Sequence, residues 1–445
     1  MAKIFRIRHR FTPFQIIILG FSGLIILGTL LLMLPIASKS GNVTPFKDAL
    51  FTATSAVCVT GLVVQDTASY WSVFGQSLIL IMIQIGGLGV VTSYIFFAIL
   101  SGRKISLWQR SVMKESISAQ KVGGIVKLTL FILVTTAAFE LVGALAMMPA
   151  FIKQFGAKGI WMSVFHAVSA FCNAGFDIMG TEKTPYVSLT QFAGSPLINI
   201  SVVILIIIGG IGFLTWDDVR EHTYHLRRYR MQSKVILVTS AVLILIPTLF
   251  FYVNEFSFLA PKERILSSLF QAVTPRTAGF NTADLTKLSG AGRTVTVILM
   301  LIGGSPGSTA GGMKTTTIAV LFANVVAVFG RKEEPHFFGR RLETKAVINA
   351  STILLMYLVL FISSGLIISL ADKLPVSVCL FEAASAIGTV GLSLGITAEL
   401  GLISRLILIV LMFFGRVGGL TLIYAAVSGN SIVNSKLPKE SITVG

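Results

Sequence analysis

The 445-residue chain has little charge, few acidic residues and few cysteines. Asp, Glu, Lys and Arg make up 12% of it, about half their share in a typical soluble protein, while 54% of the residues are hydrophobic. The cysteines, Cys58, Cys172 and Cys379, are odd in number, which argues against a disulfide framework and for small buried side chains. The shortage of charge excludes an ordinary water-soluble globular protein.

The shortage of acidic residues, 19 against 36 Lys and Arg, leaves a net charge of +17. Of the basic residues, 22 lie in five stretches: the N-terminus, Arg103–Lys127, Arg220–Lys234, Arg331–Lys345 and the C-terminal tail. These stretches alternate with apolar runs, so the positive-inside rule predicts a multi-pass protein of the plasma membrane with both termini in the cytoplasm. No soluble domain is present to bind nucleic acid, so we expect the lipid bilayer and not nucleic acid as a partner.

Long apolar runs dominate the chain, and most can cross the roughly 30 Å of a bilayer core. The first run is longer than the apolar part of a signal peptide, so it is expected to be a retained helix. The runs are Phe14–Leu34, Leu78–Leu100, Leu128–Phe151, Ile198–Leu214, Val235–Tyr252, Val295–Ile302, Ala346–Leu370 and Leu406–Val427. They predict an all-α polytopic membrane protein.

A short motif that ends in glycine occurs four times, with its glycines 114, 104 and 112 residues apart. Each copy follows an apolar segment of about 10–12 residues, too short to span a bilayer and therefore typical of a re-entrant segment. The short segments are Phe46–Val57, Trp161–Phe171, Arg264–Val273 and Val376–Ile387. Since each must be covered by protein or water, the four predict one shared central pore.

The fold class predicted from this pattern is four tandem helix–pore-loop–helix repeats, arranged pseudo-fourfold around that pore. The expected divisions are a cytosolic basic N-terminus (1–10), repeat 1 (11–102), repeat 2 (125–215), repeat 3 (234–329), repeat 4 (345–429) and a cytosolic tail (430–445). Repeat 3 is expected to have a broken second helix and a loop at 303–317.

Residues at the four motifs align as a candidate selectivity filter for a monovalent cation. Glycine allows positive φ, so that successive carbonyl groups can point to one side and form stacked oxygen rings that replace the water shell of a cation. The aligned residues are Cys58, Val59, Thr60, Gly61, Cys172, Asn173, Ala174, Gly175, Arg276, Thr277, Ala278, Gly279, Gly388, Thr389, Val390 and Gly391. No carboxylate lies within them, which argues against a divalent ion. Asp66, Asp177 and Asp284 lie just outside, where they either enrich cations or form a solvated face.

The second helices share a glycine signature: Ile85–Gly89, Ile208–Gly212, Ile302–Gly307 and Phe414–Gly419. Its small residues either serve close helix packing alone or also line the pore. In repeat 3 five glycines and a proline follow Ile302, and a helix cannot easily continue through them. We interpret this unwound segment as a gate below the filter. Partial matches to G-x-S-x-G and Walker A motifs lack a preceding strand, so no enzyme activity is expected.

Two charges interrupt the apolar helices. Arg416 aligns with Gly87, Gly210 and Gly304 of the other repeats, and a charge at membrane depth marks a functional site by default. A purely structural or snorkelling arginine is the alternative. Glu140 has no evident partner, and a structural hydrogen bond is as good an explanation as a functional role. His222 and His225 share a helical face in a basic loop, but the histidines are not expected to bind a metal.

With these motifs the chain resembles the Trk/Ktr/HKT superfamily of potassium transporters, most closely the membrane subunit of the bacterial Ktr system. The resemblance implies potassium uptake, a homodimer, and a separate cytosolic nucleotide-binding ring subunit that moves the gate. It also implies that the gate loop obstructs the cytosolic exit and that Arg416 is an electrostatic barrier or an anchor for that loop. The gate residues are then Gly303, Gly304, Ser305, Pro306, Gly307, Ser308, Thr309, Ala310, Gly311, Gly312, Lys314 and Arg416.

The transported ion is expected to be K⁺, with no cofactor in this chain and no metal other than K⁺ at the filter. Only Gly388–Gly391 approaches the Thr-Val-Gly-Tyr-Gly of tetrameric potassium channels, which leaves selectivity and sodium coupling open. The competing hypothesis is an alternating-access secondary carrier for an organic solute, which would have two rocking halves and a polar midplane site. Fourfold repetition of a re-entrant loop disfavours it.

Overall fold

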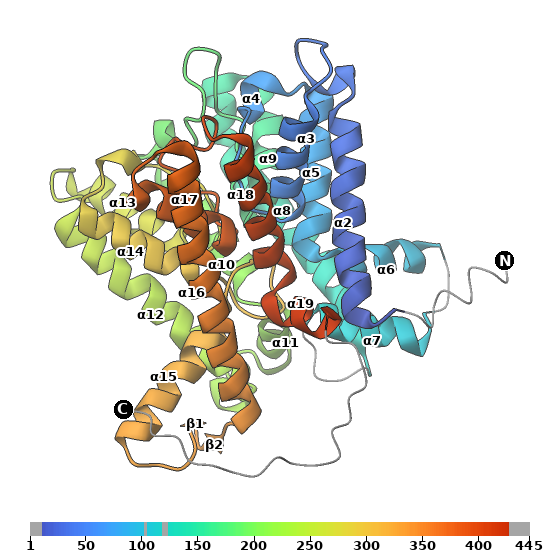
Figure 1. The fold of residues 1–445 in the computed structure, drawn as a ribbon, viewed down its shortest axis with the longest axis vertical. Coiled ribbons are helices and arrows are strands. Elements are labelled where there is room, and N and C mark those ends of the chain that lie inside the picture. The colour runs from blue at the N-terminus through green and yellow to red at the C-terminus, as the bar shows by residue number, and fades with distance from the viewer. Residues whose placement is uncertain (1–10, 102–104, 118–122, 427–445) are drawn as a thin grey trace.

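The computed structural model describes residues 11–101, 105–117 and 123–426, and these are mostly helical (Figure 1). The N-terminal division 1–10 and the tail 430–445 lie outside the described residues. Four helices are long and apolar enough to cross a membrane: α2 (Pro13–Leu32), α8 (Ile125–Phe155), α12 (Met231–Asn254) and α16 (Thr344–Asp372). Only 28–33% of their most apolar windows is buried, so most of their side chains present an apolar surface to lipid.

A short helix follows each of these long ones and ends at the glycine motif. The four are α3 (Phe46–Val57), α9 (Lys158–Phe171), α13 (Pro261–Val273) and α17 (Val376–Gly388). Each is mostly buried and holds a fully enclosed phenylalanine, namely Phe51, Phe165, Phe270 and Phe381. Helices of this length do not span a bilayer, and their burial meets the requirement that re-entrant backbone be covered by protein.

The second helices differ from the sequence-based expectation, because three of them bend sharply inside apolar runs that are predicted to be single spans. The bent pairs are α5 (Val73–Leu88) with α6 (Val90–Leu100), α10 (Pro196–Gly210) with α11 (Phe213–His222), and α18 (Leu402–Val417) with α19 (Gly419–Ala426). The bends measure 100°, 95° and 90°. At each bend one glycine of the signature, Gly89, Gly212 or Gly418, has a φ of 87–93° and a ψ of 135–141°, a conformation that glycine adopts far more readily than other residues.

In repeat 3 the helix is interrupted rather than bent. Helix α14 (Gly290–Leu301) ends, the chain makes a loop, and helix α15 (Thr315–Phe329) begins. A bridge between Ile302 and Met313 closes the base of this loop. The remaining elements are short: α4 (Thr67–Tyr70), α7 (Leu107–Ser116), η1 (Pro35–Ala37), η2 (Thr190–Phe192), η3 (Leu226–Arg228), η4 (Leu285–Lys287), and the antiparallel strands β1 (His336–Phe337) and β2 (Arg340–Arg341).

The repeats pack in a closed cycle. The second helix of each repeat contacts the short helix of the next: α5 with α9, α10 with α13, α14 with α17, and α18 with α3. At the last seam Arg405 of α18 forms a partly buried ion pair with Asp48 of α3, with 2.8 Å between Nη1 and Oδ1, and so joins repeat 4 to repeat 1. This cyclic packing confirms the predicted fold class, a helical membrane protein of four pore-loop repeats around one axis.

Candidate cation pore

The four motif glycines meet around the axis, each against the loop of the next repeat. A Cβ atom added to Gly61, Gly175, Gly279 or Gly391 would lie less than 3.0 Å from a backbone oxygen of the neighbouring loop. Those oxygens belong, in the same order, to Ala174, Ala278, Val390 and Thr60. All four glycines have positive φ, between 68° and 96°. Only glycine fits such a position, because space and backbone conformation both forbid a side chain.

The backbone N–H groups of the motif loops turn back onto the short helices. Thr60, Ala174 and Val390 donate to carbonyl groups of Ser55, Ser169 and Ser385, each over 2.8 Å, and Ala278 donates to Thr274 over 3.0 Å. The residue two places before each glycine is left-handed: Val59, Asn173, Thr277 and Thr389 have φ of 49–67°. With their N–H groups bonded on the helix side, the loops keep their carbonyl groups available on the other side, as oxygen rings for a cation require.

The glycine pairs of the second helices allow close packing behind the motif loops. A Cβ atom on Gly86, Gly209 or Gly415 would lie within 3.0 Å of the last carbonyl oxygens of the short helices, those of Val57, Phe171 and Ile387. In repeats 1, 2 and 4 the first glycine of the signature therefore serves packing, as the small-residue interpretation predicts, whereas Gly303 of repeat 3 lies against Gly311 of its own loop. The second position differs between repeats: Gly87 and Arg416 line a cavity on the side of the ring away from the glycine motifs, whereas Gly210 lies against the loop of repeat 3, and Gly304 is part of that loop.

An outer cavity of about 510 Å³ opens directly onto the ring, and all four motif glycines line it. Asp66, Asp177 and Asp284 line it too, so the structure brings together the three carboxyl groups that follow the motifs. Asp66 accepts hydrogen bonds from the N–H groups of Ser69 (2.8 Å) and Tyr186 (2.9 Å) and so ties the outer loops of repeats 1 and 2 together. Its carboxylate is both structural and a source of negative potential at the mouth.

The other two acids of the outer cavity differ in their titration. The hydroxyl and N–H of Thr286 donate to Asp284 and, with nearby Lys287, lower its pKa. Burial raises the pKa of Asp177 to about 7, and the charge of Asp66 adds to this, against a hydrogen bond from the N–H of Met179. Asp284 thus stays charged near neutral pH, while Asp177 gains its charge as pH rises through about 7.

We expect cation uptake at low concentration to depend on external pH through Asp177. Because its carboxyl is neutral below pH 7 and negative above, the apparent KM for the cation should fall about threefold between pH 6 and pH 8. Asp177→Asn should hold KM at the low-pH value throughout. The control Asp284→Asn should raise KM but keep the pH slope. A slope that survives in Asp177→Asn would show that another group is responsible. The measurement is initial uptake rate against concentration in proteoliposomes.

The loop of repeat 3 crosses the axis on the inner side of the ring. On one side its Thr309 donates from Oγ1 to the Phe171 carbonyl (2.9 Å) and from its N–H to Gly209 (3.2 Å), both in repeat 2. On the other side the N–H of Gly312 donates to Gly415 of repeat 4 over 3.1 Å, and Gly311 lies against Thr389. Repeats 2 and 4 are opposite in the cycle, so the loop spans the pore.

Arg416 holds this loop to repeat 1. Its guanidinium donates to the carbonyl group of Thr309 in the loop and to those of Gly86 and Gly87 at the end of α5. Helix α5 ends there, and its Gly86 carbonyl also accepts from the N–H of Gly89, so Arg416 supplies donors that the last turn of the helix lacks. Arg416 therefore satisfies the free end of one broken helix and clamps the loop with the same side chain.

Lys314 lies at the inner end of the loop and bonds the loop to itself. Its Nζ donates to the carbonyl groups of Ala310 (2.7 Å) and Gly311 (3.4 Å). Together with Arg416 it lines an inner cavity of about 250 Å³. The loop therefore separates two cavities, one open to the motif glycines and one that carries two basic groups.

Two acidic side chains of the interior have partners that sequence analysis did not find. Glu140 accepts a hydrogen bond from Gln84 Nε2 over 3.3 Å and lies 4.0 Å from the Cys172 sulfur. Glu382 of α17 accepts from Ser393 and Thr397 behind the fourth motif. The three cysteines are buried and unpaired, as expected. A carboxyl group in a short, buried helix needs a hydrogen-bond partner on the adjoining loop. This requirement could have identified Glu382 from the sequence.

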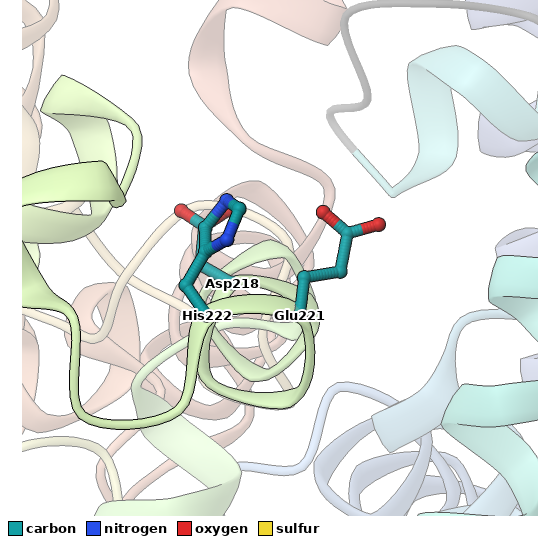
Figure 2. A group of neighbouring side chains, drawn as sticks. All are labelled: Asp218, Glu221 and His222. Atoms are coloured by element: carbon teal, nitrogen blue, oxygen red, sulfur yellow. The ribbon is translucent and has the colours of Figure 1, made fainter.

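Among the residues that the structure describes, one group of possible metal ligands lies on α11 (Figure 2). Candidate ligand atoms of Asp218, Glu221 and His222 lie within 4.8 Å of one another. The Asp218 carboxylate, however, already accepts from Ser233 Oγ (2.6 Å) and from the N–H of Arg230 (3.0 Å), and it pairs with the Arg230 guanidinium. It stabilises the connection between α11 and α12, and this group supports no metal-dependent role.

A closed ring of four glycine loops, held inside a helical membrane protein between two cavities, defines a membrane cation transport protein. The chain belongs to the TrkH family, described as cation transport proteins, whose model matches residues 6–433. This confirms the resemblance found in the sequence, and the family is one of transporters, not of enzymes.

Relatives and a solved structure agree with this assignment. The chain is 41% identical to the potassium/sodium uptake protein NtpJ of Enterococcus hirae, over 99% of each chain. It is 36% identical to the Ktr system potassium uptake protein B of Bacillus subtilis, over 94% of this chain and 93% of that protein. The crystal structure of the potassium transporter TrkH from Vibrio parahaemolyticus shares the fold, with a TM-score of 0.76 at 20% identity, and the match covers 94% and 86% of the two chains.

Proposed function

We propose that the chain takes up K⁺ through a filter formed by the four motif loops, with the loop of repeat 3 as its gate. The observation that carries this proposal is the ring itself, in which each motif glycine packs against the carbonyl group that precedes the next. Four such contacts in cyclic order enclose one axis with backbone oxygens and no carboxylate. That environment suits a monovalent cation stripped of water.

The gate proposal rests on the course of the repeat 3 loop. It is held to three other repeats by Thr309, Gly312 and Arg416, so it lies across the pore in a closed arrangement. Opening requires these bonds to break, and a protein partner on the inner side is a natural source of that energy.

We further propose that the inner cavity faces the cytoplasm. The basic segments after α11 and around β1 and β2 lie at the end of the molecule remote from α4 and the outer loops (Figure 1), which fits the positive-inside rule. A cytosolic nucleotide-binding ring subunit would then dock on this basic face, on a homodimer of the chain. The resemblance to the Ktr system motivates this assembly, and one relative is named as protein B of that system.

The test is cation flux into proteoliposomes with K⁺, Na⁺ or neither outside. We expect K⁺ flux to exceed Na⁺ flux, and both to be small while the loop is closed, so a variant that lacks residues 306–311 serves as the open reference. Na⁺ is included because one relative is named for both ions. Exchange of an organic solute without cation flux, in either protein, would contradict the filter and favour a carrier.

A further inference from the structure

Asn173 is the one amide among the four residues that stand two places before the motif glycines. Its counterparts are Val59, Thr277 and Thr389. All four are left-handed, and asparagine tolerates this conformation better than most residues. Asn173 is 1% exposed. An amide at such a buried position needs partners for its donors and acceptor, and these partners decide what the residue does.

The donors of Asn173 go to the filter strand of the next repeat. Nδ2 lies 3.2 Å from the Arg276 carbonyl oxygen and 3.3 Å from Thr277 Oγ1. The contact with a carbonyl oxygen fixes the orientation of the amide, because a carbonyl can only accept. Asn173 therefore bonds two consecutive residues of the third motif loop, one through its backbone and one through its side chain.

The acceptor of Asn173 faces the gate. Its Oδ1 lies 3.3 Å from Thr309 Oγ1 of the repeat 3 loop. The same hydroxyl lies 2.9 Å from the Phe171 carbonyl, so its single proton is shared between two acceptors and the amide contact is the longer one. The Thr309 hydroxyl of the gate loop thus contacts Asn173, and the Asn173 side chain also bonds the filter strand of repeat 3, which lies opposite repeat 1.

The opposite side of the ring has a contact at the equivalent position. A Cβ atom on Gly311 would meet the side-chain oxygen of Thr389, which has no hydrogen-bond partner among the described residues. The loop therefore touches the inner end of the filter at two opposed positions. Only on the Asn173 side does a hydrogen-bonded chain continue from the loop into a neighbouring filter strand.

We propose that Asn173 is a selectivity-determining residue through which the gate loop sets the position of the third filter strand. The proposal rests on the assignment of the motif loops as filter and of the repeat 3 loop as gate. With the loop in place, Thr309 restrains the amide and the amide restrains the Arg276 carbonyl. When the loop leaves, the amide loses that restraint and the carbonyl can move. Opening of the gate and the ion preference of the filter are then coupled.

The test compares the K⁺/Na⁺ ratio of the small flux that proteoliposomes show while the loop is closed, because only then does Thr309 contact Asn173. Asn173→Thr gives the second motif loop the threonine that the third and fourth loops have at the equivalent positions, 277 and 389. Thr309→Val removes only the hydroxyl group. Each is expected to change the ratio about fivefold, the effect of one hydrogen bond. The double variant should change it no further, because both act through one chain of contacts. Ser308→Ala is the matched control: its hydroxyl bonds within the loop to Ser305, so the ratio should stay, whatever happens to total flux.

Two outcomes would overturn the coupling. One is a Thr309→Val ratio equal to that of the unmodified protein, and the other is additive effects in the double variant. If Asn173→Thr does not fold, Thr309→Val alone decides, since its side chain keeps the same volume. If the variants carry K⁺ with an unchanged K⁺/Na⁺ ratio, the coupling is wrong but the proposal of a K⁺ pore stands. If neither the unmodified protein nor the open reference that lacks residues 306–311 carries K⁺, the proposed function itself is wrong.

Discussion

Replacement of Gly391 by serine is expected to lower K⁺ uptake at least about tenfold and to bring the K⁺/Na⁺ flux ratio towards one. Gly391 has a φ of 96°, and a non-glycine residue there costs about 1–3 kcal/mol. Its Cβ would also overlap the Thr60 carbonyl oxygen. Because Thr60 belongs to the first motif loop, the substitution displaces two of the four filter strands. The measurement is uptake of both ions into proteoliposomes.

Gly395 offers a matched control. It has the same φ of 96°, but no atom lies within 4 Å of its Cβ position, although it lines the outer cavity. Gly395→Ser therefore imposes the backbone strain without the overlap at the ring. We expect it to keep the ion preference. If both variants lose it equally, strain in the outer loop and not the ring explains the effect, and the filter assignment is wrong.

Substitution of Arg416 by glutamine is expected to raise K⁺ flux about tenfold in the absence of any partner protein. The arginine donates to three backbone carbonyl groups, one in the gate loop and two in α5. A hydrogen bond from a charged group contributes about 1.5–3 kcal/mol, and a shift of about 1.4 kcal/mol changes the ratio of open to closed protein tenfold. The measurement is K⁺ efflux from loaded proteoliposomes.

Two further variants separate an anchor from an electrostatic barrier. Arg416→Lys keeps the charge but cannot bond three carbonyl groups in the same way, and Lys314→Met removes a charge from the inner cavity but leaves the anchor. An anchor predicts that Arg416→Lys raises the flux and Lys314→Met has the smaller effect. The reverse order would show that charge near the exit, and not attachment of the loop, limits permeation.

The ring could be predicted from the sequence because its determinants are local and repeated. Each copy joins a short apolar segment to a glycine motif, so the motif predicts where each short helix ends. The broken helix of repeat 3 was equally visible, since Gly303–Gly312 contains a cluster of residues that cannot extend a helix. Repetition supplied the long-range information, namely that the loops share one axis.

The bends of the other second helices were missed because a single glycine inside an apolar run does not reveal its conformation. Gly89, Gly212 and Gly418 look like packing residues, and only their positive φ shows that the helices end there. The partners of Arg416 and Asn173 were hidden for a related reason. They are mostly backbone carbonyl groups distant in sequence, and a carbonyl carries no signature in the sequence.

The course of the repeat 3 loop, which we propose as the gate, explains why one repeat alone carries it. The loop reaches from repeat 2 to repeat 4 and fills the axis beneath the ring. A second loop of this kind would have to pass through the same volume. A pore assembled from four identical chains would have four copies of such a loop or none. A single loop that crosses the centre is therefore possible only where one polypeptide contains all four repeats, because the repeats can then differ in sequence.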